Sequence, residues 1–549
     1  MPSDTAPTSP GRPCFITTPI YYVNDRPHVG HAYSTLAADV LARWRRMEGR
    51  EVFLLTGTDE HGQKVEKAAK DAGMGPQAFT DQVSRHFRDL TVPMGLSIDD
   101  FIRTTEERHK RACTALWEKL AANGEIYLGH YEGWYAVRDE AFYGPDELTE
   151  REGVKYAPSG APVEWVREPS YFFRLSAWQD RLLDFYEANP DFILPASRRN
   201  EVIAFVKSGL GDLSISRTSF TWGVKVPGDP AHVMYVWLDA LTNYITAAGY
   251  PDDNKRFTKW WPAEVHFVGK DILRFHAIYW PAFLMAAGLA PPQRVFAHGW
   301  WTIEGQKISK SLGNAIDPVT LVEEFGLDPV RYFLLREVPF GQDGDFSRVA
   351  LIGRNNGELA NALGNLANRT LSLIQKNCGG ELPPPAALAS PRPDQKELGL
   401  GATWWDDDWE FISASGHAEL PDTFGISGQN AWLQEKISDF FNEQRFDLAL
   451  ELIFASIREG NGYITRQQPW KLKKEGFDER AAEVLRRLHD LLRVAATLLQ
   501  PFMPTTMAKL LDQLGVPEDA RGLGDLATPL PAGLPLPPPA PLFAKIETA

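Results

Sequence analysis

The feature that most constrains the fold is an alternation of strand-like and helix-like segments, which stops near residue 125 and resumes near residue 232. The strand-like segments are rich in β-branched and aromatic residues, whereas the helix-like segments repeat apolar residues at helical spacing. Tyr33, Leu36, Val40 and Trp44, for example, share one helix face. This alternation predicts a parallel sheet covered by helices. Its members are residues 14–23, 51–62, 99–105 and 106–124, and then 232–249, 264–288 and 294–301.

The remaining segments differ in texture and indicate further domains. Residues 126–230 contain short strand-like pieces separated by Gly and Pro, so we expect an insertion into the α/β domain. Helical periodicity in 430–464 and 480–500 predicts a bundle, interrupted by a Pro/Gly-rich insertion at 379–428. The predicted α/β domain comprises residues 13–125 and 231–300, with a connective domain at 126–230 between the two parts. A loop region at 301–352 and a helical domain at 353–530 follow. The two ends are a disordered tail at 1–12 and a Pro-rich tail at 531–549 that is expected to form no core.

Composition excludes several classes of protein. The net charge of −15 argues against a histone-like, nonspecific nucleic-acid binder, although local basic patches can still meet a tRNA. Cys14, Cys113 and Cys378 lie far apart without a C-x-x-C pair, which argues against a disulfide framework and favours a reducing cytoplasm. No run of about 18 apolar residues occurs, so we expect no membrane-spanning helix. The first 13 residues lack the apolar segment of a secretory signal.

Two histidines around a glycine, His28, Gly30 and His31, stand where the first strand-like segment gives way to a helix. One interpretation is that the histidines cap the helix or lie on the surface. The other is a phosphate site, because a helix N-terminus offers N–H groups and a positive dipole end, and imidazole adds donors. A glycine allows a ligand to approach the backbone. The segment by itself is compatible with both interpretations.

A second motif, EGQKISKSLGN, occupies residues 304–314 just after a predicted strand. Lys307 and Lys310 are three residues apart, with Ser309 between them and Ser311 after them, in a loop that glycines flank. Two lysines at this spacing can follow the charge of a migrating phosphate. The alternative is a solvated basic loop without a ligand.

Together, the two motifs resemble those of the class I aminoacyl-tRNA synthetases, in which H-x-G-H and K-x-S-K-S follow the first and last strands of one α/β domain. Within that class the chain is similar to the methionyl-tRNA synthetase family over residues 13–510. The strings that carry the narrower resemblance are TTPIYYVNDRPHVGH, LLTGTDEHG, YVWLDALTNY, VGKDILRFH and QPW. The resemblance implies a Rossmann-like parallel-sheet catalytic domain with an inserted connective domain, followed by an α-helical anticodon-binding bundle.

Three other functions remain as alternatives. The isoleucyl, valyl and leucyl synthetases carry a large editing insertion, for which residues 126–230 are too short. A non-catalytic tRNA-binding protein with a degenerate synthetase fold would not need the intact motif residues. A plain nucleotidyltransferase would leave the anticodon-like helical end unexplained.

The resemblance implies activation of L-methionine by ATP to methionyl-adenylate and pyrophosphate, and then transfer to the 3′-terminal adenosine of tRNA(Met). Mg²⁺ accompanies ATP and bridges its phosphates. Such chemistry depends on positioning and on stabilisation of charge. By resemblance, the histidine motif holds the phosphates and the two lysines stabilise charge as pyrophosphate leaves. The implied catalytic residues are His28, Gly30, His31, Lys307 and Lys310, and the ATP or adenylate site adds Gly269, Asp271, Ser309 and Ser311.

Resemblance also places a methionine site beside the nucleotide site. Asp59 is expected to take the substrate ammonium, because an acid between apolar walls needs a cationic partner. The thioether favours aromatic contacts, and Tyr22 and His276 carry donors that can meet sulfur. Ordinary core packing is the alternative for Trp237, Tyr244 and Ile272. The implied methionine-binding residues are Ile20, Tyr22, Asp59, Trp237, Ala240, Leu241, Tyr244, Ile272 and His276.

In the helical region, an Asn-x-x-x-Arg and a Pro-Trp match the positions with which relatives read a CAU anticodon. Here they are Asn365 and Arg369, and Pro469 and Trp470. Trp can stack on a splayed-out base while Asn and Arg read base edges. The alternative for Trp470 is a capping or core aromatic residue.

The chain departs from many relatives in its inserted domain, where they hold zinc with C-x-x-C pairs. Ala136 and Asp139 stand at such positions here, so no structural zinc is expected. Some relatives append a further tRNA-binding domain that supports dimerisation, and the chain ends without one. We therefore expect a monomer.

Overall fold

The computed structural model describes residues 11–23, 26–139, 141–151, 153–303, 306–307, 316–385 and 426–547. The chain divides into two compact units. The sheet unit comprises residues 11–42 and 51–300, and the helical unit comprises residues 43–50 with the described part of 301–549. Residues 1–10 of the predicted N-terminal tail, most of the Pro/Gly-rich insertion, Ser309, Lys310 and Ser311 lie outside the described residues.

The sheet unit is built on a six-stranded parallel sheet in the order β3-β2-β1-β14-β15-β9, which confirms the predicted parallel α/β core. The register of β1 against β2 shifts between Thr17 and Ile20, around Pro19, which cannot donate to a ladder. The strands are β1 Cys14–Tyr22, β2 Val52–Asp59, β3 Asp100–Arg103, β9 Ile193–Leu194, β14 Val265–Gly269 and β15 Val295–His298.

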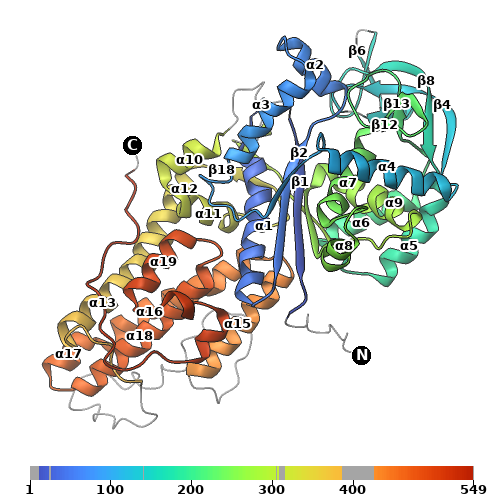
Figure 1. Ribbon diagram of the computed structural model, residues 1–549. Helices are drawn as coiled ribbons and strands as arrows, with labels where there is room; N and C mark the ends of the chain where they lie inside the picture. The colour runs from blue at the N-terminus through green and yellow to red at the C-terminus, as the bar shows by residue number, and fades with distance from the viewer. Residues whose placement is uncertain are drawn as a thin grey trace. The chain divides into compact units, whose positions relative to one another are not determined.

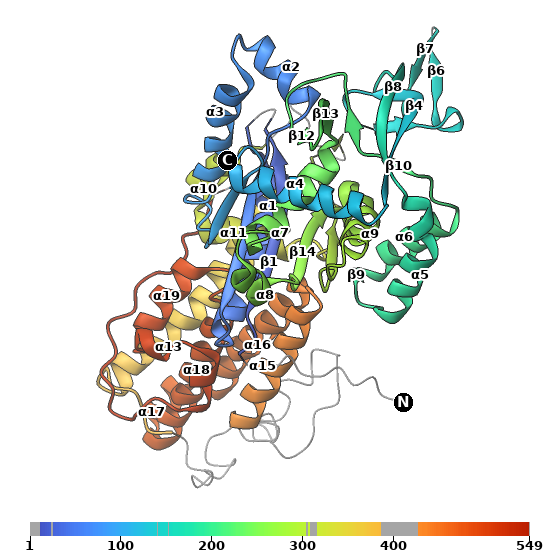
Figure 2. The ribbon, with the colours of Figure 1, turned by 45° about the vertical axis from the view of Figure 1, so that its right-hand side comes forward.

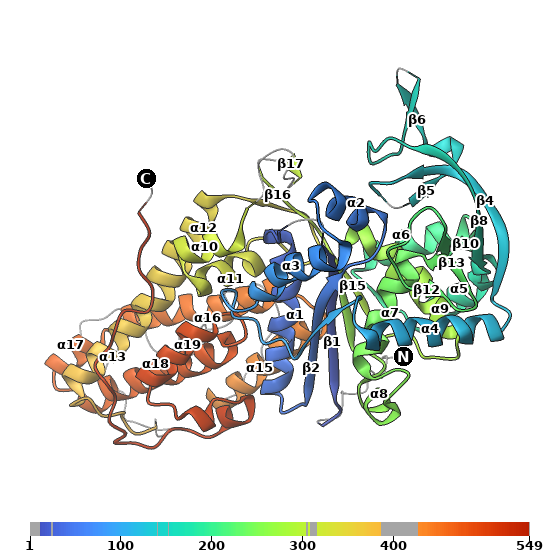
Figure 3. The ribbon, with the colours of Figure 1, turned by 45° about the horizontal axis from the view of Figure 1, so that its top comes forward.

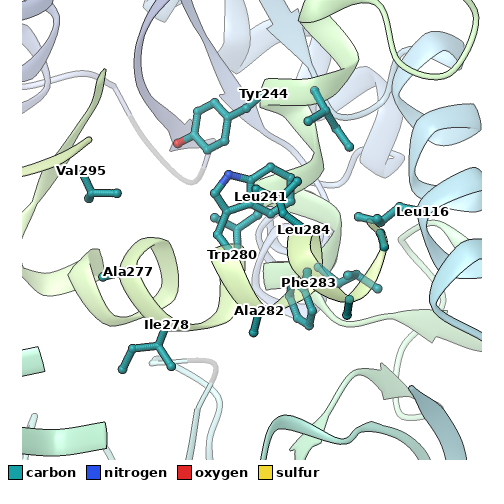
Figure 4. Close-up of a cluster of buried hydrophobic side chains, with 14 of the residues drawn as sticks. Leu116, Leu241, Tyr244, Ala277, Ile278, Trp280, Ala282, Phe283, Leu284 and Val295 are labelled. Carbon is teal, nitrogen blue, oxygen red and sulfur yellow. The ribbon is translucent and has the colours of Figure 1, made fainter. Parts of the chain in front are cut away.

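Helices cover both faces of this sheet. Figure 3 shows α1 on one side of β1 and β2, and α7 and α4 on the other. Trp280 of α9 is buried and lies toward Tyr244 of α7 in the main core, with ring centroids 6.2 Å apart (Figure 4). The helices of the unit are α1 Val29–Met47, whose last turn lies in the helical unit, α2 Gln63–Asp71, α3 Pro76–Asp89, α4 Glu107–Ala122, α7 Val236–Ala248, α8 Asn254–Trp260 and α9 Trp280–Ala286.

The predicted insertion contains a separate antiparallel sheet in the order β10-β8-β4-β5, with a small β6–β7 hairpin (Figure 2). Ile193–Leu194, inside the same span, nevertheless joins the parallel sheet beside β15. The elements are β4 Ile126–Ala136, β5 Ala141–Tyr143, β6 Thr149–Arg151, β7 Val154–Tyr156, β8 Glu164–Phe173, β10 Leu213–Ser214, α5 Gln179–Ala188 and α6 Ala196–Lys207.

One predicted strand lies in a different sheet from the one expected. Residues 232–249 were expected to form a strand–helix unit of the parallel sheet, but β13 Asp229–Met234 pairs antiparallel with β11 Ser216–Arg217 and β12 Lys225–Val226. The expectation was wrong for the strand because the turn at Gly228, at φ +78°, folds β13 back onto β12. The helix part, α7, forms as expected.

The helical unit is a bundle, as the periodicity predicts, preceded by a short sheet in the order β17-β16-β18. In Figure 1, α13, α16 and α18 lie side by side, with α17 at their end. The elements are β16 Trp301–Ile303, β17 Gln306–Lys307, β18 Gly344–Phe346, α10 Pro318–Phe325, α11 Leu327–Arg336, α12 Arg348–Arg354, α13 Asn365–Asn377, α15 Ile426–Asn442, α16 Phe446–Gln467, α17 Pro469–Lys474, α18 Asp478–Leu499 and α19 Pro504–Gln513.

The Pro-rich C-terminal segment, residues 530–547, has no helix or strand, but it is fixed on the bundle. The N–H of Leu536 donates to the carbonyl of Gly380 at 2.9 Å, and Gln375 donates to the Leu536 carbonyl at 2.8 Å. Farther on, Asn356 and Ile546 exchange two hydrogen bonds of 2.8 and 2.9 Å. Leu536 is buried, so this segment, which we call the strap, contributes to a core that the composition did not predict.

Candidate active site and anticodon-binding residues

His28, Gly30 and His31 lie at the start of α1, where the sequence predicted them. The N–H of Gly30 donates to Nδ1 of His28 at 3.1 Å, and the N–H of His28 donates to Nδ1 of His31 at 3.0 Å. The two rings stack with centroids 3.9 Å apart. Because Nδ1 accepts in each ring, a neutral imidazole must carry its proton on Nε2. His28 therefore caps the helix through Nδ1, while the Nε2 side of each ring is a donor.

Two contacts explain why this arrangement needs a glycine and a tyrosine. A Cβ on residue 30 would lie 2.9 Å from Cε1 of His28, so a larger residue would displace the stacked ring. The Tyr21 hydroxyl contacts the His31 carbonyl at 3.0 Å and Thr35 Oγ1 at 2.6 Å. Burial raises the pKa of Tyr21 to about 12, so it stays a neutral phenol that ties the end of β1 to the first turn of α1.

The residues predicted to bind methionine come together from β1, α7 and the segment after β14. Tyr244 and His276 are fully buried and hydrogen-bonded, with Oη and Nε2 2.8 Å apart. Nδ1 of His276 lies 3.0 Å from the Ile272 carbonyl, which can only accept. The ring must therefore be the Nδ1–H tautomer, with Nε2 accepting from Tyr244. Burial lowers the pKa of His276 to about 4, which agrees with a neutral ring.

The other members of this group divide by exposure. Ala240 and Leu241 are buried, whereas Ile20, Tyr22, Trp237 and Ile272 are only partly buried and pack against the same core. Trp237 stacks on Phe275 with centroids 3.6 Å apart. The Tyr22 hydroxyl donates to the His61 carbonyl at 3.1 Å. The N–H of His276 and the O–H of Tyr22, which we expected to be available to sulfur, therefore both have oxygen acceptors in this structure.

Asp59 ends β2 and is 6% exposed. Its neighbours Glu60 and His61 are held firmly. Arg103 donates to both oxygens of Glu60 at 2.7 and 2.9 Å, and the Trp222 indole donates to the Glu60 carbonyl at 2.6 Å. Residues 59–61, which we call the Asp59 loop, are thus fixed from two sides.

Asp239, on α7, is a buried acidic residue to which the sequence analysis gave no role. Its carboxylate lies between two imidazoles, 2.7 Å from His61 Nδ1 and 2.7 Å from His109 Nε2. Burial alone would raise the pKa of Asp239, but His61 and His109 lower it below the ordinary value. His109, Cys113 and Asp239 also form a group with metal-ligand chemistry. The distance between His109 Nε2 and the Asp239 carboxylate is 2.7 Å, whereas two ligand atoms of one tetrahedral zinc lie about 3.3 Å apart. The two groups are therefore placed for a hydrogen bond to each other and not for a shared zinc.

Gly269 and Asp271 lie at the carboxyl end of β14, next to the end of β15. Asp271 is exposed and accepts from the Trp300 indole at 3.1 Å. His298, at the end of β15, is buried and contacts Ser34 of α1 through Nε2 at 2.6 Å. Sequence reasoning missed His298 because its partner is 264 residues away.

Of the second motif, the structure describes only the backbone of Gln306 and Lys307, which form β17 and pair with β16. Ser309, Lys310 and Ser311 lie outside the described residues. The predicted roles of this loop therefore remain predictions.

Two of the predicted anticodon residues, Arg369 and Trp470, meet at one end of the bundle. Asn365 and Arg369 lie one turn apart on α13, and Arg369 lies over the ring of Trp470, 5.9 Å from its centroid. Pro469 is buried at the start of α17, whereas Trp470 is 43% exposed. A side chain exposed to this extent is not a core residue, so Trp470 presents an aromatic face to solvent beside a guanidinium.

Ala136 and Asp139, at which the resemblance implied cysteines in many relatives, have ordinary packing and hydrogen-bond contacts. Ala136, Ala157, Ala161 and Val163 form a small buried cluster. Asp139 accepts from the Tyr143 hydroxyl at 2.9 Å.

Comparison with known proteins agrees with this geometry. The family model of class I tRNA synthetases (M) matches residues 14–371, and that of the anticodon-binding domain of methionyl-tRNA ligase matches residues 436–549. The methionine–tRNA ligase of Rickettsia bellii is 57% identical over 507 residues, 92% of this chain and 93% of that protein. The corresponding protein of Brucella suis is 50% identical over 537 residues, 97% of this chain and 98% of that protein.

A solved structure gives the same result for the fold. Mycobacterium tuberculosis methionyl-tRNA synthetase in complex with methionyl-adenylate is 46% identical, with a TM-score of 0.88 over 97% of this chain and 99% of that one. Among the described residues, every helix is too short or too polar to cross a bilayer. The chain belongs to the methionyl-tRNA synthetase family of the class I aminoacyl-tRNA synthetases.

Proposed function

We propose that this chain activates L-methionine with ATP to methionyl-adenylate and pyrophosphate, and then transfers the methionyl group to the 3′-terminal adenosine of tRNA(Met). One observation carries the proposal. The stacked His28–His31 pair and the buried Tyr244–His276 pair belong to one unit and flank strands of one parallel sheet. In open parallel sheets, ligands bind beyond the carboxyl ends of the strands.

The histidine pair supplies donors to the phosphates. Nε2 of His28 and His31 is the protonated side of each neutral ring, since Nδ1 accepts a backbone N–H in both. The phosphates are expected to meet imidazoles more than backbone, because the N–H groups of Gly30 and His31 already have acceptors. Lys307 and Lys310 are proposed to stabilise the charge that grows on pyrophosphate as it leaves.

Mg²⁺ is expected to arrive with ATP. Imidazole donors at the start of α1 suit phosphate oxygens, whereas Mg²⁺ prefers oxygen ligands, so the metal fits on the nucleotide and not on His28 or His31. When bound, it would neutralise phosphate charge. Gly269 and Asp271, at the end of β14, are proposed to hold the adenylate ribose.

Methionine is recognised by aromatic faces. The partly buried Ile20, Tyr22, Trp237 and Ile272 can reach a ligand, and Trp237 presents a polarizable ring to the thioether. Tyr244 and His276 are hydrogen-bonded to each other, so they form a rigid neutral wall in the core that also contains Leu241. Asp59 is proposed to take the α-ammonium. The wall distinguishes methionine from amino acids that carry a charge or a strong donor.

The helical unit is proposed to read the CAU anticodon. Trp470 is exposed beside Arg369, and stacking on an unpaired base with hydrogen bonds to base edges is the usual mode of single-stranded RNA recognition. Asn365 lies on the same face of α13. We further propose that the chain acts in the cytoplasm as a monomer.

The decisive experiment is ATP–pyrophosphate exchange on the purified chain. Exchange should require methionine, and isoleucine, valine and leucine should not replace it. Charging should then be measured on tRNA carrying a CAU anticodon. A chain that binds this tRNA but exchanges no pyrophosphate with any amino acid would be a non-catalytic tRNA-binding protein, and the proposal would be wrong.

A further inference from the structure

The buried Asp239 network is a polar feature of the sheet unit that the proposed reaction does not use. The Asp239 side chain has no exposed surface. A buried carboxylate is costly unless it is paired and hydrogen-bonded, and each oxygen here accepts from one imidazole at 2.7 Å. Because the ionised carboxylate can only accept, His61 must carry a proton on Nδ1 and His109 on Nε2. The network therefore fixes two ring tautomers as well as one charge.

The three residues come from three different elements. His61 follows β2, His109 lies on α4 and Asp239 lies on α7. Asp239 thus joins two segments that are 178 and 130 residues away in the chain. Neighbouring residues of α7, Trp237 and Ala240, belong to the proposed methionine site. Two residues before His61 stands Asp59, the proposed partner of the methionine ammonium.

The Asp59 loop is held at its other points by separate contacts. Arg103 and Thr105 bind the Glu60 carboxylate, Trp222 binds the Glu60 carbonyl and Tyr22 binds the His61 carbonyl. Those contacts fix the loop to β3, to residue 222 and to β1. The 2.7 Å hydrogen bond between His61 Nδ1 and the Asp239 carboxylate fixes the loop to α7.

We propose that Asp239 is a positioning residue for methionine: with His61 and His109 it fixes the Asp59 loop to α7, so that Asp59 meets the ammonium of a methionine whose side chain lies against α7. This inference rests on the proposed role of Asp59. A substrate bound by two elements at once requires their separation to be fixed, since a misplacement of about 1 Å can cost on the order of 100-fold in rate.

The first test is Asp239→Asn, which keeps the shape but removes the charge and turns one acceptor into a donor facing an imidazole N–H. We expect the KM for methionine in pyrophosphate exchange to rise about 10- to 100-fold, with the KM for ATP changed by less than about twofold. A merely structural role would instead lower kcat and the melting temperature and leave the ratio of the two KM values unchanged.

A matched control removes another ion pair of α4. Arg111 of α4 binds Asp252, which follows α7, at 2.8 Å on an exposed surface. Asp252→Asn should leave both KM values unchanged, because this pair does not touch the Asp59 loop.

Conservative variants keep the proposal testable if Asp239→Asn does not fold. The side-chain N–H of an asparagine can replace the Nδ1–H of histidine, and that of a glutamine can replace Nε2–H. His61→Asn should therefore retain most methionine affinity, whereas His61→Leu should lose about 10- to 100-fold. His109→Gln and His109→Leu form a second such pair. Equal effects of the Asn and Leu variants at position 61 would overturn the proposal.

A double-mutant cycle separates this inference from the proposed function. If Asp239 acts through Asp59, Asp239→Asn should add less than about twofold to the methionine KM of an Asp59→Asn enzyme. Full additivity would overturn the inference while the proposed function stands. If the unmodified chain itself shows no methionine-dependent exchange, the proposed function fails first.

Discussion

His266, His276 and His298 show how burial sets the chemistry of single residues in the sheet unit. Each is buried, and burial lowers the pKa of each. Each Nδ1 has an oxygen partner within 3.0 Å: Thr17 for His266, Ile272 for His276 and Gly299 for His298. The three rings therefore act as neutral hydrogen-bonding groups at neutral pH.

The lowered pKa of His276 predicts acid sensitivity. Between its folded value of about 4 and its ordinary value of 6.5, the unfolded chain binds more protons than the folded one. The stability contributed by the neutral ring is therefore complete above pH 6.5 and is lost as the pH falls toward 4. Between pH 7 and pH 5 this loss amounts to about 2 kcal/mol. Urea unfolding of the unmodified chain and of His276→Gln at both pH values measures it, and equal losses would contradict the prediction.

Lys310→Ala tests the loop that the structure does not describe. Loss of a group that stabilises transition-state charge lowers kcat, typically by about 10²–10³-fold. Methionine binding should change little, because the lysine is proposed to act only on the leaving pyrophosphate. Exchange kinetics measure both quantities, with the exposed Lys207→Ala as control. Near-normal exchange would remove this loop from the mechanism.

Sequence could predict His28, Gly30 and His31 because their contacts are local, within three residues. It could not predict the Asp239 network, because its partners are 130 and 178 residues away and only the fold brings them together. It also could not show that Gly57 is required. A Cβ there would lie 2.0 Å from the Ile102 carbonyl on the neighbouring strand β3.

Helices α13 and α17 are the elements that carry the proposed anticodon site. Long periodic helices such as α16 and α18 were predictable from the 3.6-residue spacing. The two-residue strand β9 was not, because two residues carry no periodicity. The contact of Arg369 with Trp470 joins helices that are about 100 residues apart and depends on how the bundle packs.

Trp470→Ala should separate the two steps of the reaction. If Trp470 stacks on an anticodon base, its loss removes about 1–3 kcal/mol of binding and lowers charging efficiency roughly 5- to 150-fold. Exchange without tRNA and the melting temperature should stay unchanged, because the side chain is 43% exposed. Trp165→Ala, at another exposed tryptophan, is the matched control. A parallel fall in exchange, charging and melting temperature would make Trp470 a packing residue.

The small cluster around Ala136 predicts that the inserted antiparallel sheet keeps its shape without zinc. Ala136 belongs to a buried cluster with Ala157 and Ala161, and Asp139 accepts a hydrogen bond from Tyr143, so packing and hydrogen bonding hold both positions at which the resemblance implied cysteines. Metal analysis of the purified chain should find no stoichiometric zinc, and a chelator should leave the melting temperature unchanged. About one tightly held zinc per chain would contradict this.

At the scale of the whole molecule, the chain passes between its two units at residues 42–43, 50–51 and 300–301. The proposed methionine and adenylate residues lie in the sheet unit, whereas Lys307 and the proposed anticodon residues belong to the helical unit. Arg486 and Arg493 are buried in the helical unit and donate to backbone carbonyls of residues 383, 530, 525, 526 and 528. These contacts hold the chain that leads into the strap.

Because the strap packs on the bundle, truncating one of its buried side chains should destabilise the helical unit and leave the sheet unit unchanged. Leu536 is 6% exposed, and its truncation to alanine should cost about 2–5 kcal/mol. Leu534 and Leu536 lie over Gly515, where a Cβ would meet both side chains at 2.9 Å, so the site has little room to relax around a smaller residue. Leu536→Ala should lower the melting temperature and tRNA charging, whereas methionine-dependent exchange at 25 °C should stay unchanged. The stabilisation that methionine and ATP confer on the sheet unit should also persist, because it depends only on their affinity. Lys545→Ala, at an exposed strap position, is the control. If Leu536→Ala also lost pyrophosphate exchange, the sheet unit and the helical unit would not unfold independently. If its melting temperature were unchanged, the strap would contribute nothing to the stability of the bundle.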